Sequence, residues 1–273
     1  MGAVVDRKAP VGRGPSSQLS EAPAQPLGEV LRERYGWVSL LGMPVFIAAV
    51  LTALYLYVQS LELDSIEERA LNADRVQTLL VQHLQLTLVS TFFVLLIAIP
   101  LGVMVTRPVM RKFTPGVLAV ANIGQAAPSI GLLVILVIIM GTGFETAVYG
   151  LVAYSVLPVL RNTMVGLDQV DTSVIEAGRG MGMTKLSVLL RIELPLAVPV
   201  ILAGVRTALV INVGTAALAT FINGGGLGDM INNGLKLRRD SVLLTGSVLT
   251  ASLALTIDYV AGLAERYLRP RGL

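Results

Sequence analysis

Of the 273 residues, 54% are hydrophobic and only 14% are charged, and the mean hydropathy is +0.74. Soluble domains use roughly 25% charged residues, so this composition excludes an ordinary soluble domain and predicts an all-α membrane protein with several spans. The chain has no cysteine, which excludes disulfides and thiolate metal sites. Its formal charge of +3 is small, so the placement of the charges along the chain is more informative than their sum.

The N-terminal segment, 1–36, is expected to form a disordered tail followed by a charged surface segment, because its first part is rich in Pro, Ala, Gly and Ser. No signal-peptide pattern precedes the first apolar run, which begins near Val38. A first transmembrane helix and a polar connection are expected over 37–82. A helical core with a polar central loop at 162–195 is expected over 83–264, and a C-terminal tail over 265–273.

Six apolar runs are long enough to cross about 30 Å of hydrocarbon. They cover approximately 38–58, 84–105, 116–140, 144–160, 196–222 and 242–263. Six spans place both termini on one side, together with 15 of the 21 Lys and Arg residues, against five on the other side. The side of the termini should therefore be cytoplasmic. Lys236, Arg238 and Arg239, in the hairpin at 223–241, run against this rule.

The sequence of the central loop predicts two short helices joined by a tight turn. Ser173 and Glu176 have the spacing of a capping box, and Gly180 and Gly182 supply a stop, since glycine adopts left-handed backbone angles at low cost. Thr184 can cap a second helix. Four leucines then fall mainly on one face of that helix: Leu186, Leu189, Leu190 and Leu194.

A spaced pattern in this loop resembles the EAA loop of ABC importer permeases, which reads Glu-Ala-Ala, three residues, Gly, nine residues, Ile, one residue, Leu-Pro. The positions in register are Glu176, Ala177, Gly182, Ile192, Leu194 and Pro195. Gly178 departs from the second Ala. The resemblance implies a type I ABC importer permease fold of about six transmembrane helices. It also implies that the loop is cytoplasmic and docks on an ATPase subunit; the alternative is an amphipathic helix–turn–helix at the membrane surface.

Several further stretches resemble the permeases of osmoprotectant importers, which carry glycine betaine, choline, carnitine or proline betaine. They include NIGQAAPSIGLL, LPVLRNTMVGLDQVD and INGGGLGDMINNGL. The resemblance implies four partners: ABC ATPase subunits, an extracytoplasmic solute-binding protein, a second permease copy or paralogue, and membrane lipid. No nucleic-acid partner is expected. It also implies a multi-pass protein of a bacterial plasma membrane.

The chain is not expected to be an enzyme, because it has no GxxxxGK[ST] phosphate loop. ATP and Mg²⁺ should bind in the partner ATPase, and no cofactor or metal is expected here. An importer of another small amine or betaine, such as ergothioneine, is an alternative. An ion-coupled secondary transporter is a further one, with Asp258 as its candidate carboxylate. A membrane-embedded enzyme is disfavoured by the single histidine, His83, which is expected at the outer interface.

Polar side chains inside the spans are candidates for a translocation path or for hydrogen bonds between helices, which average only ~0.6 kcal/mol. Those in the third span are Asn122, Gln125 and Ser129, around Pro128, and those in the fifth are Asn212 and Thr215. Arg206 and Asp258 are ionisable and lie deep in the fifth and sixth spans, so we expect them to form an intramembrane ion pair.

Overall fold

The computed structural model describes residues 37–268, so the expected tails at 1–36 and 269–273 lie outside the described residues. Internal contacts divide the chain into two units, 1–42 and 43–273. The first helix, α2 (Trp37–Gln59), crosses this division, and the arrangement described below is that of the second unit.

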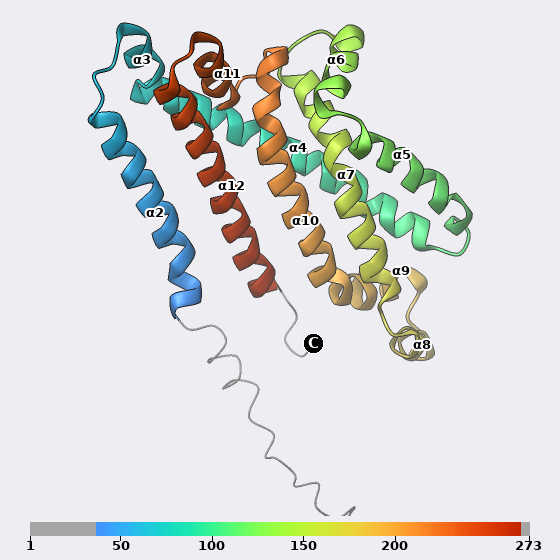
Figure 1. The fold of residues 1–273 in the computed structure, drawn as a ribbon. Coiled ribbons are helices and arrows are strands. Elements are labelled where there is room, and N and C mark those ends of the chain that lie inside the picture. Colours follow the sequence, from blue (N-terminus) through green and yellow to red (C-terminus); the bar gives the residue numbers. More distant parts are fainter. Residues whose placement is uncertain (1–36, 269–273) are drawn as a thin grey trace, which may run out of the picture. The chain divides into compact units, whose positions relative to one another are not determined.

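The described residues are helical almost throughout (Figure 1). The helices after α2 are α3 (Ser65–Ala70), α4 (Ala73–Thr106), η2 (Arg111–Phe113), α5 (Thr114–Ala126), α6 (Ser129–Met140), α7 (Phe144–Asp168) and α8 (Thr172–Gly180), then α9 (Lys185–Val188), η3 (Leu189–Glu193), α10 (Leu194–Ala216), η4 (Ala217–Ile222), α11 (Gly228–Leu237) and α12 (Asp240–Leu268). Within residues 37–268, five helical stretches are long and apolar enough to span a membrane, or six if the bent pair α5–α6 counts as one span. This confirms the predicted class.

The third expected span, 116–140, is not one straight helix. It divides into α5 and α6, which meet at a bend of 101°. The residue before the proline, Ala127, has extended backbone angles (φ −62°, ψ 140°). Proline disfavours helix in the residue before it and has no N–H to donate, which accounts for the break at Pro128.

Two helices also extend beyond the expected spans. Helix α4 begins at Ala73 rather than near residue 84, because the Asn72 side chain accepts a hydrogen bond from the Asp74 N–H at 2.9 Å and caps a polar first turn. Helix α7 continues past 160 as far as Asp168. Hydropathy locates the apolar part of a helix, but hydrogen bonds and caps decide where the helix itself begins and ends.

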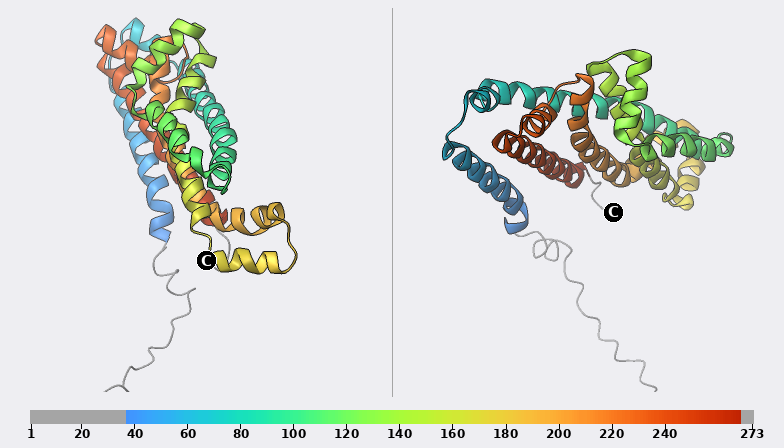
Figure 2. Two further views of the ribbon diagram at one scale, coloured as in Figure 1. Left: turned by 90° about the vertical axis from the view of Figure 1, so that its right-hand side faces the viewer. Right: turned by 45° about the horizontal axis from the view of Figure 1, so that its top comes forward.

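Helices α7 and α10 form a closely packed antiparallel pair. A Cβ on Gly204 would lie 2.7 Å from Asn162 Cβ and 2.9 Å from the Pro158 carbonyl oxygen, and one on Gly166 would lie 3.1 Å from the Ala197 carbonyl oxygen. Small residues allow helix backbones in membranes to approach this closely. Helix α4 packs across both members of the pair, and Figures 1 and 2 show it running obliquely to them.

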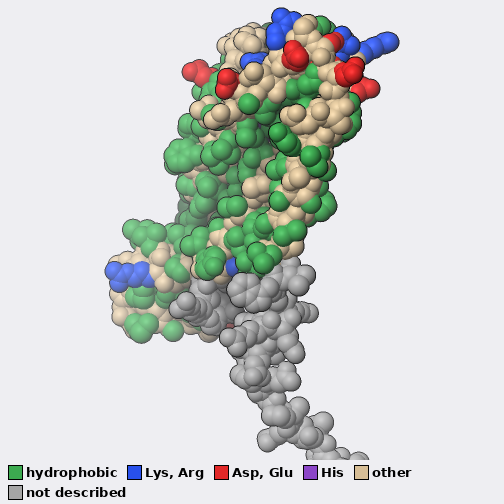
Figure 3. Space-filling view, turned by 90° about the vertical axis from the view of Figure 1, so that its left-hand side faces the viewer, with side chains coloured by type: hydrophobic (Ala, Val, Ile, Leu, Met, Phe, Trp, Pro, Cys, Tyr) green, Lys and Arg blue, Asp and Glu red, His purple; other side chains and the backbone are tan. Residues whose placement is uncertain are grey.

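On the face shown in Figure 3, hydrophobic side chains cover the long helices, acidic and basic side chains gather together at one end, and a few basic ones lie at the other end. That end carries α3, α11 and the start of α12. Three polar contacts join them there: Asp64 with Arg239 at 2.6 Å, Glu67 with the Ser241 hydroxyl at 2.6 Å, and Arg75 with Asp229 at 3.4 Å. The apolar band with a charged rim is the pattern expected of a protein set in lipid.

Two acidic groups of this end, Asp64 and Glu67, are stabilised in their charged form. The backbone N–H groups of Glu67 and Ile66, helped by Arg239, lower the pKa of Asp64. The Ser241 hydroxyl and the Asp64 backbone N–H lower the pKa of Glu67. This end also carries the basic residues Lys236, Arg238 and Arg239. Acidic partners are available there, since Asp64 pairs with Arg239 and Asp229 pairs with Arg75.

Candidate functional site

The central loop projects sideways from the end of the long helices opposite α3 and α11, and its two short helices run across them (Figure 2). Its first helix, α8, is capped by Asp171, whose side chain accepts a hydrogen bond from the Ser173 N–H at 2.8 Å. The expected capping box of Ser173 and Glu176 was therefore wrong, and Glu176 is exposed. Hydrogen bonds from the Ser173 backbone and hydroxyl lower the pKa of Asp171.

The turn between the two loop helices depends on Gly182. Its φ is +84°, and an added Cβ would meet no atom within 4 Å. Glycine is needed there for its backbone angles and not for space. The N–H of Gly182 donates to the Arg179 carbonyl at 2.9 Å, and Thr184 caps the next helix by accepting from the Ser187 N–H at 3.2 Å. The expected turn and second cap are confirmed.

The leucines of the second loop helix do not share one buried face. Leu186 and Leu190 are 63% and 55% exposed, whereas Val188 is fully buried. Within this helix lies a five-residue π segment, η3, in which the Leu194 N–H donates to the Leu189 carbonyl five residues earlier. A π segment inserts one extra residue into the helical repeat and shifts the phase of everything after it.

Gly178, the position that departs from the EAA pattern, is where the two loop helices touch. It is buried, and a Cβ added there would lie 2.7 Å from Ile192 Cδ1 and 3.5 Å from Val188 Cγ2. Ile192 belongs to the pattern, so the structure brings its two ends together. Ala177 is exposed on the outer side, and Pro195 follows η3, where it has no N–H to donate.

The outer surface of the loop is apolar with a basic fringe. Its exposed apolar side chains include Met181, at 75%, besides Leu186 and Leu190. The exposed cations of the loop are Arg179, Lys185 and Arg191. Exposed apolar side chains rimmed by polar ones at the end of a protein are typical of an interface with another protein.

One buried charge in the loop was not recognised in the sequence as having a partner. Glu193, in η3, is 5% exposed, and one of its carboxylate oxygens accepts a hydrogen bond from Arg107 Nη2 at 2.7 Å. Arg107 lies just after α4, 86 residues earlier. A charged residue amid apolar neighbours is a sequence signal for a buried pair, but the identity of the partner comes only from the fold.

The polar residues of the third and fifth spans occupy different environments. Asn212 is fully buried, and its amide donates to the Thr91 hydroxyl at 3.0 Å, so it makes a hydrogen bond between helices. Asn122 accepts a hydrogen bond from Arg161 at 2.8 Å. Ser129 and Thr215 line one cavity of only about 10 Å³. Gln125 is half-buried on α5.

Arg206 and Asp258 lie together. The guanidinium donates from Nε and Nη2 to the two carboxylate oxygens at 2.5 Å and 2.6 Å, which joins α10 to α12. A second carboxylate oxygen, Glu265 Oε2, lies 3.9 Å from Arg206 Nη1, and a hollow of about 220 Å³ adjoins the pair of Arg206 and Asp258. Bidentate geometry of this kind gives the strongest contact between arginine and a carboxylate.

His83 occupies the core and not the interface. Its ring is fully buried, with Nε2 2.9 Å from the Val213 carbonyl oxygen and Nδ1 3.2 Å from the Leu227 nitrogen. The Leu227 N–H must donate to Nδ1, so the ring carries its proton on Nε2 and donates it to Val213. The expectation of an interface residue was wrong, because the glycine-rich turn at 223–228 folds over the ring and covers it.

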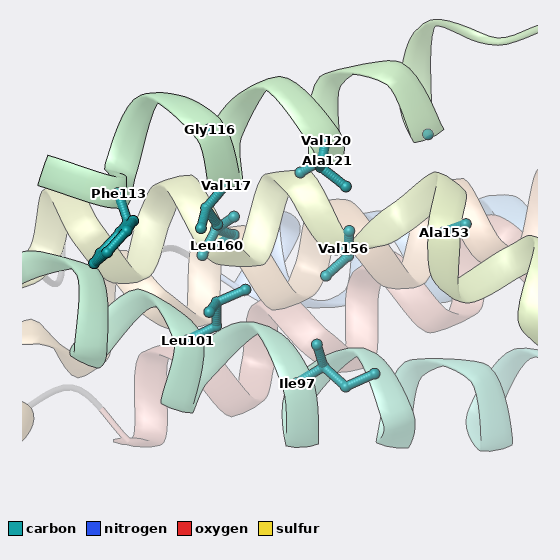
Figure 4. A pocket seen from close by; sticks show the side chains of 11 residues that line it. Ile97, Leu101, Phe113, Gly116, Val117, Val120, Ala121, Ala153, Val156 and Leu160 are labelled. Carbon is teal, nitrogen blue, oxygen red and sulfur yellow. The ribbon is translucent and has the colours of Figure 1, made fainter. Parts of the chain in front are cut away.

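A groove of about 510 Å³ runs between α4, α5 and α7 (Figure 4). Its lining side chains include Ile97, Leu101, Phe113, Val120 and Val156. These carry neither charge nor hydrogen-bonding groups, so the groove is suited to hydrocarbon and not to a charged or zwitterionic solute.

Comparisons with known proteins agree with this architecture. OpuBB, a choline transport system permease protein of Bacillus subtilis, is 42% identical over 70% of this chain and 88% of its own length. A carnitine transport permease protein of Listeria monocytogenes, OpuCD, is 43% identical over 69% and 84%. OsmY, an osmoprotectant import permease protein of Salmonella typhimurium, is 37% identical over 82% and 94%.

Among solved structures, inward facing conformations of the MetNI methionine ABC transporter match with a TM-score of 0.63 and 28% identity, over 71% of this chain and 96% of that chain. An amino acid ABC transporter, at 18% identity and a TM-score of 0.59, shares the fold. A family model for the binding-protein-dependent transport system inner membrane component matches residues 98–271. The chain therefore belongs to the family of binding-protein-dependent inner membrane transport components, the permeases of ABC importers.

Proposed function

We propose that this permease takes up small quaternary-ammonium or zwitterionic osmoprotectants, such as choline, carnitine and glycine betaine. The observation that carries the proposal is its identity of 37–43% to permeases named for these solutes, over most of both chains. These names favour osmoprotectants over an ergothioneine-like cargo. The sequence has no phosphate loop, so the energy is expected to come from ATP and Mg²⁺ bound by a separate ATPase.

The ATPase should dock on the central loop. Met181, Leu186 and Leu190 offer exposed apolar side chains there, and the surrounding cations can pair with acidic groups of a partner. The loop connects α7 directly to α10, which are packed as one unit. Movement of the docked loop would therefore tilt both helices together and open the path alternately to the two sides of the membrane.

The solute path is expected to be completed by a second copy or a paralogue of the chain. In the described part of this chain, Asn212 and Asn122 are already engaged in hydrogen bonds, and the groove between α4, α5 and α7 is apolar. A polar path can form between two such chains. Selectivity is expected in a separate solute-binding protein, where aromatic side chains can hold a quaternary ammonium through cation–π contact.

The proposed orientation places the central loop in the cytoplasm of a bacterial cell, with both termini on the same side. The excess of Lys and Arg on that side supports it. The solute-binding protein would then deliver its ligand at the opposite end, which carries α3, α11 and the glycine-rich turn.

The first experiment is purification of the tagged chain in mild detergent from its own cells, followed by identification of its partners. Gly182→Val forces a β-branched residue to φ +84°, a strain worth about 1–3 kcal/mol, and we expect it to reduce the co-purified ATPase by about tenfold. The matched control is Gly180→Val, which adds the same side chain two residues earlier, in open space and at ordinary backbone angles. It should retain the ATPase.

Transport is then measured in vesicles that contain the complex, with labelled choline, carnitine and glycine betaine. We expect uptake that requires ATP and the solute-binding protein. Uptake that persists without ATP but collapses with an ion gradient would identify a secondary transporter instead. Transport of none of the three solutes by an ATP-competent complex would refute the proposed cargo.

A further inference from the structure

An ion pair with a buried carboxylate connects the central loop to a helix that is distant in sequence. Arg107 Nη2 lies 2.7 Å from Glu193 Oε2, and the side chains are 35% and 6% exposed. Glu193 stands between Ile192 and Leu194, two residues of the EAA pattern. Arg107 stands at the end of α4, which α5, α6 and α7 separate from the loop in the chain. The pair is therefore a direct polar link between the coupling segment and α4.

The backbone holds Arg107 in place. Pro108 follows it and disfavours helix at Arg107, whose ψ is 141°, so α4 ends there. The guanidinium Nε also donates to the carbonyl of Val103 at 3.2 Å. One side of the guanidinium is thus anchored to the last turn of α4, and the other side is directed at Glu193.

Glu193 is held in a comparable way from the other side. It is the last residue of the π segment, and Leu194, next along, donates its N–H to Leu189. Pro195 follows without an N–H to donate. This altered hydrogen-bonding pattern rotates Glu193 inward, while Leu190 and Arg191 remain exposed. The π segment explains why a glutamate of an amphipathic loop helix faces the protein.

Apolar residues from four elements form a cluster next to the pair in the chain, and the Glu193 side chain is only 6% exposed. The cluster contains Leu167, Ala197 and Ile201, with Ile99, Val103, Leu189, Leu194 and Val205 packed against it. In such surroundings an unpaired carboxylate is costly, because nothing replaces its lost hydration. The pair should therefore stay closed while the elements around it move together.

From these observations we infer that Arg107 and Glu193 are positioning residues that make α4 move with the coupling loop. The inference rests on the proposed function, because it assigns a route by which the docked ATPase moves this helix. Helix α4 has 34 residues and extends for about 50 Å. It carries His83 and Gln82 near its far end, where both contact the glycine-rich turn. The pair thus joins the loop to an element that reaches the opposite end of the permease.

The test uses the assembled complex with its ATPase and solute-binding protein, and the variants Arg107→Gln and Glu193→Gln. We expect each to insert, to retain the ATPase and to hydrolyse ATP at the basal rate. The rate of ATP-driven solute uptake should fall by at least about tenfold, because removal of one partner leaves the other charge unpaired. The exchange Arg107→Glu with Glu193→Arg should restore much of the uptake. Arg111→Gln, an exposed cation of the same connection, is the matched control and should transport normally.

Three results would overturn the inference. The single variants could transport at the wild-type rate, they could lose the ATPase, or the charge exchange could restore nothing. Loss of the ATPase would mean that the pair only folds the loop. Failure of the proposed function is distinguishable, because the wild-type complex itself would then show no ATP-driven uptake.

A second measurement distinguishes a fixed link from a contact that must open. The chain has no cysteine, so Arg107→Cys with Glu193→Cys provides the only two thiols. Bridging them with a short bifunctional thiol reagent should raise the uptake of this double variant, because the bridge replaces the lost ion pair. If bridging abolished the remaining uptake, the two segments would have to separate during transport and the inference would be wrong.

Discussion

At the residue scale, His83 illustrates how one side chain can join three elements. It lies on α4, donates to the Val213 carbonyl of α10 and accepts from the Leu227 N–H of the glycine-rich turn. Gly226 packs against the ring, and a Cβ there would lie 3.1 Å from Nδ1. The glycines of this turn therefore have a local purpose, since they let the backbone approach the ring closely enough to donate to it.

We expect His83→Phe to lower the thermal stability of the purified permease. The change keeps an aromatic ring but leaves the Leu227 N–H and the Val213 carbonyl unpaired in a buried site, at about 1–3 kcal/mol for each group. Gln82→Ala, which removes only a 3.2 Å contact with the Gly226 N–H, should lower the melting temperature less. Equal melting temperatures for His83→Phe and the wild type would show that the turn does not depend on the ring.

The ion pair of Arg206 and Asp258 leads to a second residue-scale prediction. Arg206→Gln and Asp258→Asn should each lower the melting temperature. The first leaves Asp258 without its arginine, and the second leaves Arg206 with the more distant Glu265, at 3.9 Å. The double variant should lose less stability than the sum of the two single losses, since it leaves neither charge behind. Strictly additive losses, measured in the same detergent, would show that the two charges do not stabilise each other.

At the element scale, the antiparallel pair α7–α10 determines how the loop is presented. The two helices meet through glycines, so their backbones are in contact and cannot slide without a clash. The loop helices α8 and α9 bridge their ends, and the π segment sets which side chains face outward. Pro158 and Pro199 lie inside α7 and α10, whereas Pro128 lies at the break where α5 turns into α6.

We expect Gly204→Ala to destabilise the permease by about 1–3 kcal/mol through overpacking. The new methyl would meet Asn162 Cβ at 2.7 Å and the Pro158 carbonyl oxygen at 2.9 Å, and the backbone atom cannot move aside alone. Gly214→Ala, in the same helix but with no atom within 4 Å, should be neutral or stabilising. The measurement is thermal unfolding of both variants, and a loss as large for Gly214→Ala would refute the packing explanation.

Several elements could be predicted from the sequence, and others could not, for identifiable reasons. The turn at Gly182 and the cap at Thr184 follow from local backbone preferences, and the structure contains both. The capping residue of α8 was misassigned, because Asp171 and Ser173 offer competing caps two residues apart. The phase of the leucines after residue 188 was also wrong, because a π segment leaves no mark in hydrophobic periodicity.

At the scale of the whole molecule, the charged end and the loop end define the two faces of the membrane protein. The charged end combines α3, α11 and the start of α12 through ion pairs and hydrogen bonds. The loop end carries the EAA pattern and the pair of Arg107 and Glu193. The basic residues after α11 do not contradict the orientation, because Arg239 and Arg75 are paired there with Asp64 and Asp229.

The orientation can be tested with single cysteines, since the natural chain has none. Met181 is 75% exposed in the central loop and Leu235 is 67% exposed in α11. In right-side-out vesicles, a membrane-impermeant maleimide should label Leu235→Cys and not Met181→Cys, and inside-out vesicles should give the reverse. Labelling of both positions from one side would contradict the assignment of the hairpin at 223–241.

The sequence by itself determined the class of the protein, the approximate spans and the position of the EAA pattern. These depend on composition, on the length of apolar runs and on motifs within about twenty residues, all of which are local properties of a chain in lipid. Only the tertiary structure decided which buried polar groups are partners: Arg107 with Glu193, Asn212 with Thr91, and His83 with the glycine-rich turn. These partners lie 86 to 144 residues apart in the chain. Such pairs form because a polar group taken out of water binds whichever partner the packing of helices brings near, and that packing is not a local property.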